Sequence, residues 1–330
     1  MTPSLHELLR CPVCRRPLRD DGSALRCDGC GAFFPVEDGV PRLLDDRLPG
    51  IAAKRAEIAG WVAMARAQGW YEPDDDVDAH LPYLCRDLGW DDKTWRANEH
   101  SFSLVLERYA RPGMRVLEVG AAKCWAAQHL VPLGCEYVGT DLLADASIGL
   151  GRGAFYEARV GSFGRVQADG EQLPFASGAF DLTFCVAALH HALDLGAMVR
   201  EMARVTRRGG IVVALNEGTR ALTASGDVPD QAEERAYGIN EHVHTLYAYL
   251  WAFTRAGLAV RRVEQAEGYG DLARRRIAGR LLSLPLVGRS AATFFSQTCH
   301  GYSGVSLYSR KLAPLVGGGS RRAKPGYASA

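Results

Sequence analysis

Residues 115–122 read Arg-Val-Leu-Glu-Val-Gly-Ala-Ala, an apolar strand that runs directly into a turn of small residues. Further strand-like segments follow, and helical segments separate most of them. Strands that alternate with single helices indicate a parallel sheet with helices on both faces. The sequence therefore predicts an α/β protein with a Rossmann-like doubly wound sheet. Its predicted strands span 115–119, 137–141, 165–169, 180–186, 211–215, 259–263 and 305–309.

Small or acidic residues stand where the first four predicted strands end. Ligands of such sheets bind at the carboxyl ends of the strands. Glycine and alanine let the backbone approach a ligand closely there, and an acidic residue about twenty positions after the first strand can accept hydrogen bonds from ribose hydroxyls. The candidate cofactor-binding residues are Glu118, Gly120, Ala121, Asp141, Leu142, Asp169, Gly170 and Ala187.

Several motifs occur in the order and spacing of one enzyme family. They are Glu118-Val-Gly120, the segment from Asp169 to Phe175 that ends in Leu-Pro-Phe, Leu189-His-His191 and Arg207-Arg-Gly-Gly210. Together they resemble the class I methyltransferases that depend on S-adenosylmethionine (SAM), in particular the subgroup that methylates small molecules and quinones. The resemblance covers residues 114–216 and implies SAM as the cofactor, with Asp141 on its ribose and Asp169 on its adenine amino group.

The turn after the first strand departs from the pattern of that family. The family places a second glycine at position 122 and often a third at position 124, where this chain has Ala122 and Cys124. Alanine adds only a methyl group, so we expect the turn to survive. Lys123 adds a flexible cation, which either pairs with the methionine carboxylate of the cofactor or points to solvent.

Two cysteine pairs, Cys11-Pro-Val-Cys14 and Cys27-Asp-Gly-Cys30, lie near the start of the chain with twelve residues between them. Such pairs close a tetrahedral site around zinc, and four cysteine ligands leave no open position for a substrate. We therefore expect a structural Zn²⁺ on Cys11, Cys14, Cys27 and Cys30, whose loss destabilises the N-terminal module and spares the sheet. The segment around the pairs resembles the small zinc-ribbon proteins that activate methyltransferases of tRNA, rRNA and release factors.

Histidines are the candidate catalytic groups, because a histidine near its free pKa can take a proton from an oxygen or nitrogen nucleophile. His190 and His191 follow the fourth strand at the mouth of the expected pocket, and His242 lies beyond the fifth strand. His190 can shape the pocket instead. His242 and His244 alternate as metal ligands do, although a helix start and a surface position explain them as well. Glu217 ends the fifth strand and can bind a polar group of a substrate.

The chain of 330 residues divides by its pattern into four parts. We expect a zinc ribbon at 1–48, a helical cap or linker at 49–111, a methyltransferase domain at 112–316 and a disordered tail at 317–330. The acidic cluster at 74–78 is expected to be a solvated loop. No role is predicted for the insert at 264–303, which is rich in arginine and small apolar residues.

The composition of the chain indicates which binding partners and which cellular compartment to expect. The formal net charge is +1, so the whole chain has no global attraction to nucleic acid or to a membrane. The scattered cysteines fit reduced thiols, and neither a leader nor a membrane-length apolar run is present, which together predict a cytoplasmic protein. We expect a small-molecule acceptor and no membrane partner, with nucleic acid not favoured. The oligomeric state is open.

We therefore expect a SAM-dependent methyltransferase that transfers a methyl group to an oxygen or nitrogen of a small molecule. One alternative is an rRNA or tRNA methyltransferase that recognises RNA through the ribbon, for which RNA binding would depend steeply on salt. A second alternative is a non-catalytic scaffold with a degenerate cofactor site, suggested by Ala122 and Lys123. A folded protein that fails to bind the cofactor would favour that second alternative.

Overall fold

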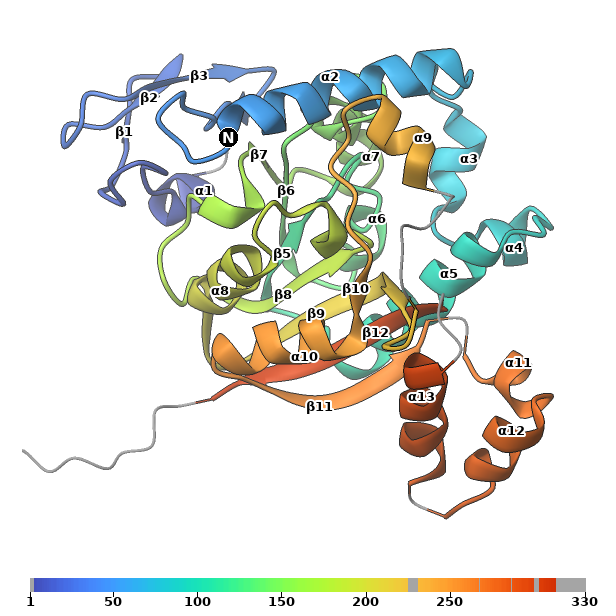
Figure 1. Ribbon diagram of the computed structural model, residues 1–330. Coiled ribbons are helices and arrows are strands. Elements are labelled where there is room, and N and C mark those ends of the chain that lie inside the picture. Colours follow the sequence, from blue (N-terminus) through green and yellow to red (C-terminus); the bar gives the residue numbers. More distant parts are fainter. Residues whose placement is uncertain (1–2, 225–230, 267, 286, 300–302, 313–330) are drawn as a thin grey trace, which may run out of the picture.

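The computed structural model describes residues 3–224, 231–266, 268–285, 287–299 and 303–312. A sheet with strand order β11-β12-β9-β8-β5-β6-β7 forms its centre, and β10 pairs with β9 (Figure 1). Neighbouring strands are parallel, except that β12 is antiparallel to β9 and β11. This arrangement confirms the predicted α/β, Rossmann-like sheet. Its strands are β5 (Arg115–Val119), β6 (Glu136–Asp141), β7 (Gly164–Gln167), β8 (Phe180–Val186), β9 (Thr206–Arg220), β10 (His244–Thr245), β11 (Leu258–Gln265) and β12 (Ser303–Lys311).

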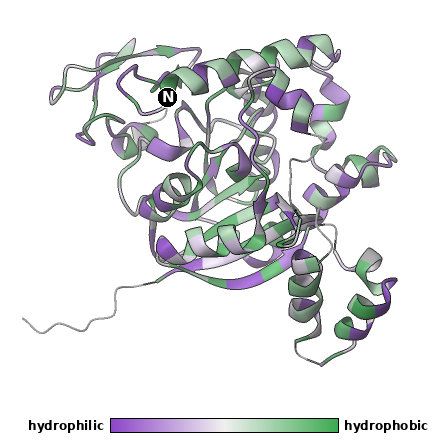
Figure 2. Ribbon diagram, in the orientation of Figure 1, coloured by the Kyte–Doolittle hydropathy of each residue, from purple (hydrophilic) through white to green (hydrophobic). Residues whose placement is uncertain are grey.

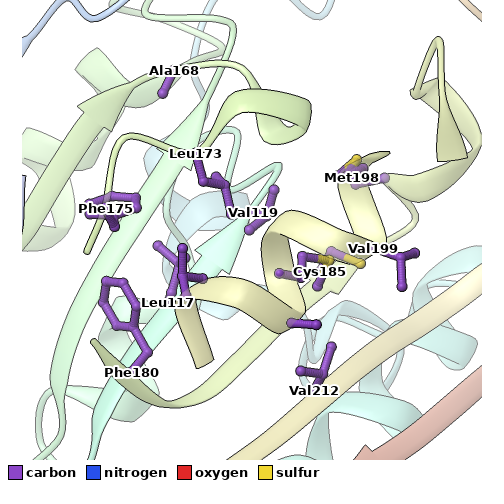
Figure 3. Close-up of a cluster of buried hydrophobic side chains, with 14 of the residues drawn as sticks. Leu117, Val119, Ala168, Leu173, Phe175, Phe180, Cys185, Met198, Val199 and Val212 are labelled. Atoms are coloured by element: carbon purple, nitrogen blue, oxygen red, sulfur yellow. The ribbon is translucent and has the colours of Figure 1, made fainter. Parts of the chain in front are cut away.

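Alternate residues of the central strands face two separate cores, as the two-residue period of a strand requires. Leu117 of β5 lies in one core and its neighbour Val116 in the other. Figure 3 shows part of the first core, where Phe175 and Phe180 pack near Leu117. Helices of the first core are α8 (Leu195–Val205) and α10 (Leu246–Arg255); helices of the second are α5 (Lys93–Arg108), α6 (Ala127–Leu130) and α7 (Gly153–Val160).

The N-terminal ribbon is built on a small antiparallel sheet that docks on the β7 edge of the large one. Leu9 forms an antiparallel bridge with Phe175, and Arg42 forms a parallel bridge with Gln167 of β7. Phe34 is fully buried in the same apolar core as Phe175. The ribbon therefore covers an otherwise open sheet edge and shares its core with the large domain. Its elements are α1 (Pro3–Leu8), β1 (Arg19–Asp20), β2 (Ala24–Arg26), β3 (Phe33–Glu37) and β4 (Val40–Pro41).

The helical segment that follows begins with α2 (Ile51–Ala67), which lies over the carboxyl ends of the parallel strands (Figure 1). It continues through α3 (Asp75–His80) and α4 (Leu84–Asp87) to α5 on one face of the sheet. The expected solvated loop at 74–78 is wrong, because residues from Asp75 onward form α3 and Asp78 is fully buried. Asp78 Oδ1 lies 3.0 Å from Lys123 Nζ and its Oδ2 lies 2.8 Å from Arg152 Nε. The ion pairs with these two cations attach α3 to the large domain. They also show that the side chain of Lys123 points toward Asp78.

The insert after β11 folds into three helices, α11 (Gly270–Ala273), α12 (Arg276–Leu282) and α13 (Gly288–Cys299), before the chain returns as β12. One further helix, α9 (Ala232–Ala236), precedes β10. The tail expected at 317–330 lies outside the described residues. Within the described part of the chain, no helix combines the length and the apolar character that crossing a bilayer requires.

Candidate functional site

A cavity of about 310 Å³ opens at the carboxyl ends of β5 to β8, beneath α2. Six of the eight candidate cofactor residues line it: Gly120, Asp141, Leu142, Asp169, Gly170 and Ala187. Glu118 and Ala121 do not. Glu118 is buried behind the wall, where the Tyr137 hydroxyl donates to it and burial raises its pKa to about 8. Cofactor roles for Glu118 and Ala121 therefore stay predictions.

The turn after β5 has the backbone shape that glycines usually provide. Gly120, Ala122 and Cys124 have φ angles of +75°, +41° and +64°. Only glycine adopts this left-handed region without strain, and other residues pay about 1–2 kcal/mol there. The turn nevertheless forms, and the Ala122 N–H donates to Asp141 Oδ2 over 2.8 Å. A side chain at position 120 would be excluded, since a Cβ there would lie 2.6 Å from Ala188 Cβ.

Replacing Ala122 with glycine should therefore stabilise the chain by up to about 1 kcal/mol, because the strain removed exceeds the flexibility that glycine adds to the unfolded chain. The measurement is the free energy of unfolding in urea. Ala121→Gly is the matched control, since Ala121 lacks a positive φ and should lose about 0.5–1 kcal/mol on becoming glycine. Equal losses in both variants would show that the turn at Ala122 is not strained.

Asp141 and Asp169 face the cavity from the ends of β6 and β7. Asp141 accepts from the N–H groups of Ala122 and Leu143, each over 2.8 Å, and burial raises its pKa despite those bonds. Asp169 Oδ1 accepts from the Glu171 N–H over 2.8 Å, while its Oδ2 is buried without a hydrogen-bond partner among the described residues. An unpartnered buried carboxylate oxygen calls for a donor. The amino group of an adenine is such a donor, so these residues fit SAM.

Helix α2 supplies charged groups that the sequence did not point to. Lys54 Nζ lies 2.8 Å from Asp169 Oδ1 and 2.6 Å from Glu171 Oε1, and it is almost fully buried. Glu57 lies one turn further along the helix, and burial raises its pKa to about 8. Both residues line the cavity with Trp61. The partners of Lys54 lie more than a hundred positions away, so no local pattern could have identified it.

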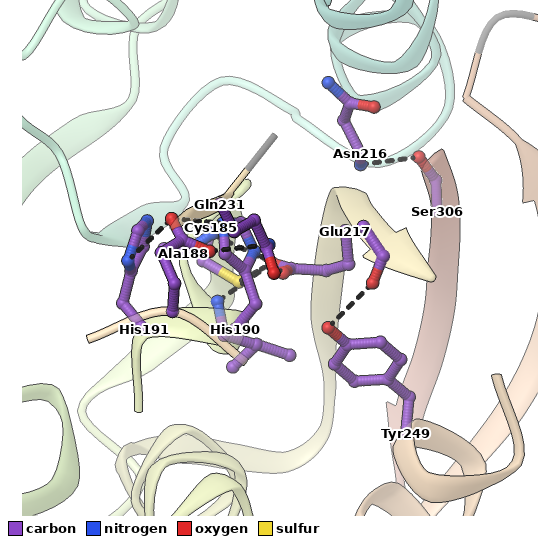
Figure 4. A network of polar contacts seen from close by, with 12 residues as sticks. Cys185, Ala188, His190, His191, Asn216, Glu217, Gln231, Tyr249 and Ser306 are labelled. Carbon is purple, nitrogen blue, oxygen red and sulfur yellow. Dashed lines mark hydrogen bonds and ion pairs between the residues drawn. The ribbon is translucent and has the colours of Figure 1, made fainter. Parts of the chain in front are cut away.

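His190 is held by a buried carboxylate at the end of the site. Its Nδ1 donates to Glu217 Oε2 over 2.9 Å, and Glu217 Oε1 accepts from the N–H groups of Ala188 and Leu189 (Figure 4). Burial by itself would lower the pKa of His190, but the hydrogen bond and charge of Glu217 outweigh it and raise that pKa. Glu217 thus positions a histidine, whereas the sequence suggested a contact with substrate.

His191 lines the cavity directly, unlike His190 and His242. Its Nδ1 donates to the Asn240 carbonyl over 2.8 Å, and its ring meets Trp61 edge-on. Burial and the neighbouring His190 lower the pKa of His191 to about 3, so it stays neutral. His242 contributes a backbone N–H that donates to the His190 carbonyl over 3.0 Å. The ring centroids of His242 and His244 lie 6.1 Å apart, so these two alternating histidines are close to each other.

Glu241 completes a polar cluster beside the cavity. Its Oε1 lies 3.4 Å from His191 Nδ1 and 3.9 Å from His190 Nε2, and burial raises its pKa to about 6. One ligand atom each from His190, His191 and Glu241 lies within 4.8 Å of the others, close enough to share an ion. The sequence predicted the histidines from their place after β8. It did not predict Glu241, which follows a loop rather than a strand.

The four cysteines of the ribbon converge as predicted. Their sulfur atoms lie within 4.8 Å of one another, with 3.6 Å between Cys11 and Cys30 and 3.3 Å between Cys14 and Cys27. A tetrahedral zinc with bonds of 2.3 Å separates its sulfur ligands by about 3.8 Å. The cluster therefore fits a four-thiolate zinc site.

Known proteins resemble both parts of the chain. Residues 117–214 match the family described as "Methyltransferase domain", and residues 2–39 match the family described as "Trm112p-like protein". A demethylmenaquinone methyltransferase from Mycobacterium marinum is 33% identical over 128 residues, which cover 39% of this chain and 50% of that protein. Another from Mycobacterium sp. (strain KMS) is 29% identical over 182 residues, 52% of this chain and 75% of that protein. The chain thus spans only half to three quarters of these relatives.

A solved structure, geranyl diphosphate C-methyltransferase from Streptomyces coelicolor, aligns with a TM-score of 0.53. It is 14% identical and covers 80% of this chain and 100% of that chain, so it shows the shared fold alone. With the family matches and the four-cysteine cluster, the chain combines a class I methyltransferase domain with an N-terminal Trm112p-like ribbon.

Proposed function

We propose that this chain, which carries a class I SAM-dependent methyltransferase domain, transfers a methyl group from SAM to an oxygen or nitrogen atom of a small-molecule acceptor. The observation that carries the proposal is the cavity between Asp141 and Asp169, with an unpartnered carboxylate oxygen of Asp169 buried at its wall. The relatives named demethylmenaquinone methyltransferase support a small acceptor.

Each residue around the cavity has a distinct binding role in this proposal. Asp141 accepts hydrogen bonds from the ribose hydroxyls, and Asp169 Oδ2 accepts one from the adenine amino group. Lys54 offsets the charge of Asp169 and Glu171, which makes two adjacent buried carboxylates tolerable. Gly120 lines the cavity, and its missing side chain lets the backbone pack against Ala188 and approach the cofactor. When bound, SAM supplies a methyl group on a sulfonium that is already activated.

The acceptor approaches next to His191, Trp61 and Glu57, which line the cavity below α2. An oxygen or nitrogen nucleophile loses a proton on methylation. His190 lies outside the cavity lining but next to His191, with 4.3 Å between their ring centroids. It is the group we assign to take the proton, since Glu217 fixes its Nδ1 proton and leaves Nε2 as the acceptor. Glu217 acts through His190 and is a positioning residue.

The zinc ion has a structural part in this proposal. Cys11, Cys14, Cys27 and Cys30 would fill all four positions of a tetrahedral ion, so no position is left for chemistry. The ion would hold the ribbon against the β7 edge. Since the buried face of the ribbon already packs on its own methyltransferase domain, RNA recognition would have to use the opposite surface.

A calorimetric titration of the zinc-replete protein with S-adenosylhomocysteine tests the proposal. We expect stoichiometric binding, and Asp141→Ala should weaken it by about 1–3 kcal/mol, the scale of a lost charged hydrogen-bond acceptor. Asp181→Ala is the control, because Asp181 pairs with Arg207 and lies outside the cavity lining. Unchanged affinity in Asp141→Ala would remove Asp141 from the site. No binding by a folded protein would favour the scaffold alternative.

A further inference from the structure

The helices α11, α12 and α13 form an arm that stands apart from the sheet and its covering helices (Figure 1). The arm, residues 270–299, has a small core of its own that includes Leu272, Ala278 and Ala292. Helix α13 ties it to the body, for example through the 2.7 Å hydrogen bond between the hydroxyls of Tyr247 and Thr298. Helix α12 packs on α13 and leaves its outer face to solvent.

Charge is distributed very unevenly between the arm and the rest of the chain. Residues 270–299 contain five arginines and one acidic residue, which gives the arm a formal charge of +4. The rest of the chain carries −3, so the net value of +1 hides the difference. Arg275, Arg276, Arg280 and Arg289 of the arm are exposed. Within the described ranges, none of these four forms an ion pair with a carboxylate.

Large apolar side chains are exposed among these arginines. Ile277, Leu284 and Val287 are 54%, 45% and 57% exposed. Ile277 lies on α12, whereas Leu284 and Val287 lie in the connection between α12 and α13. Figure 2 shows the resulting mixture of hydrophobic and hydrophilic colour on the arm. Solubility does not explain why three large apolar side chains are exposed on so small a group of helices.

We propose that the arm docks on an anionic lipid bilayer, with Ile277, Leu284 and Val287 entering the interface and the surrounding arginines contacting lipid phosphates. Exposed arginines and aliphatic side chains lie together on α12 and in the connection to α13, and this is the composition of segments that lie in a membrane interface. The charge complements an anionic leaflet, which attracts clustered arginines. RNA fits this surface less well, because aliphatic side chains gain nothing against phosphates and the three exposed apolar residues include no aromatic ring for stacking on bases.

The arm lies on the same edge of the sheet as the cofactor cavity. β12 is antiparallel to both β9 and β11, so β11 runs parallel to β9 and its carboxyl end points to the carboxyl edge. The arm leaves the sheet from that end of β11 and returns at Ser303, which pairs with Thr219 near the end of β9. This inference stands independently of the methyltransferase proposal.

The test is sedimentation of the full-length, zinc-loaded protein with vesicles of phosphatidylcholine, alone or mixed with phosphatidylglycerol. We expect binding to the mixed vesicles to exceed binding to phosphatidylcholine by about tenfold or more and to fall with added salt. The double variants Ile277→Ser with Leu284→Ser, and Arg275→Glu with Arg276→Glu, should each lose most of this binding. Phe33→Ser with Arg26→Glu is the matched control, since it removes an exposed apolar residue and an arginine from the ribbon.

Circular dichroism and thermal unfolding would show that every variant remains folded. The proposal is wrong if the wild type does not bind mixed vesicles, or if the arm variants bind them as the control does. It is also wrong if polyuridylate binds instead, with binding lost in the arginine variant and kept in the Ile277→Ser, Leu284→Ser variant. That pattern would assign the surface to nucleic acid.

Discussion

Replacing Cys11 with serine should release the zinc and destabilise the whole chain, including the β7 edge of the large sheet. Zinc binding to four thiolates contributes on the order of 10 kcal/mol to the folding of small zinc modules. A serine hydroxyl does not replace a thiolate, and Cys11 is fully buried in the ribbon. We therefore expect the ribbon to lose its structure at ordinary temperature.

The effect should spread because the ribbon is not a separate unit. Leu9 bridges to Phe175 and the Leu43 N–H donates to the Gln167 carbonyl of β7 over 2.9 Å, so unfolding of the ribbon exposes β7 and the segment after it. The sequence alone predicted a spared sheet, since nothing in a ribbon motif shows what it packs on. The shared core revises that expectation.

Two measurements check this prediction. Zinc content per chain should fall to near zero, and amide hydrogen exchange should accelerate in residues 164–176 as well as in the ribbon. Cys299→Ser is the control, because Cys299 is exposed and far from the cluster along the chain. Retained zinc would contradict the four-thiolate site, and unchanged protection of β7 would contradict the coupling.

The part of the site that the sequence predicts well is the part that follows from strand position. Asp141 ends β6 and Asp169 follows the end of β7, and parallel strands bring their ends to one edge of the sheet whatever the loops do. The left-handed backbone conformation at positions 122 and 124 also follows from the sequence, because the family pattern has glycine there. Both residues have positive φ angles in the structure. Helix α6 begins only at Ala127, after the left-handed residues of this turn.

The part that the sequence does not predict depends on contacts between distant segments. Lys54, Glu57 and Glu241 reach the site from a cap helix and a loop, and helical or loop patterns carry no information on what they cover. Asp78 shows the same limit. An acidic run normally stays in solvent, but its partner Arg152 lies 74 positions away and makes burial tolerable.

Replacing His190 with glutamine should lower kcat by about 10²–10⁴-fold, the usual contribution of a general base, while S-adenosylhomocysteine affinity stays close to that of the wild type. The affinity should be preserved because His190 does not line the cofactor cavity. The rate would be measured with the acceptor that reacts fastest in a panel of phenols, quinols and amines. Loss of cofactor binding along with activity would point to a structural role instead.

The pH dependence of the reaction rate distinguishes a catalytic base from a residue that only packs in the site. Glu217 raises the pKa of His190 above its ordinary 6.5, and only the neutral imidazole can accept a proton. The wild-type rate should therefore rise with pH through a midpoint above 6.5. Glu217→Gln removes the charge that raises this pKa, so burial then dominates and the midpoint should move to lower pH.

Nuclear magnetic resonance of the His190 ring can follow the same titration without any acceptor. A matching downward shift in Glu217→Gln would tie the kinetic midpoint to His190 itself. Wild-type enzyme treated with a chelator that spares the ribbon zinc is a necessary comparison, because His190, His191 and Glu241 lie close enough to share an ion. If chelation abolished turnover and Glu217→Gln left the kinetic midpoint unmoved, His190 would act as a ligand and the assignment as base would fail.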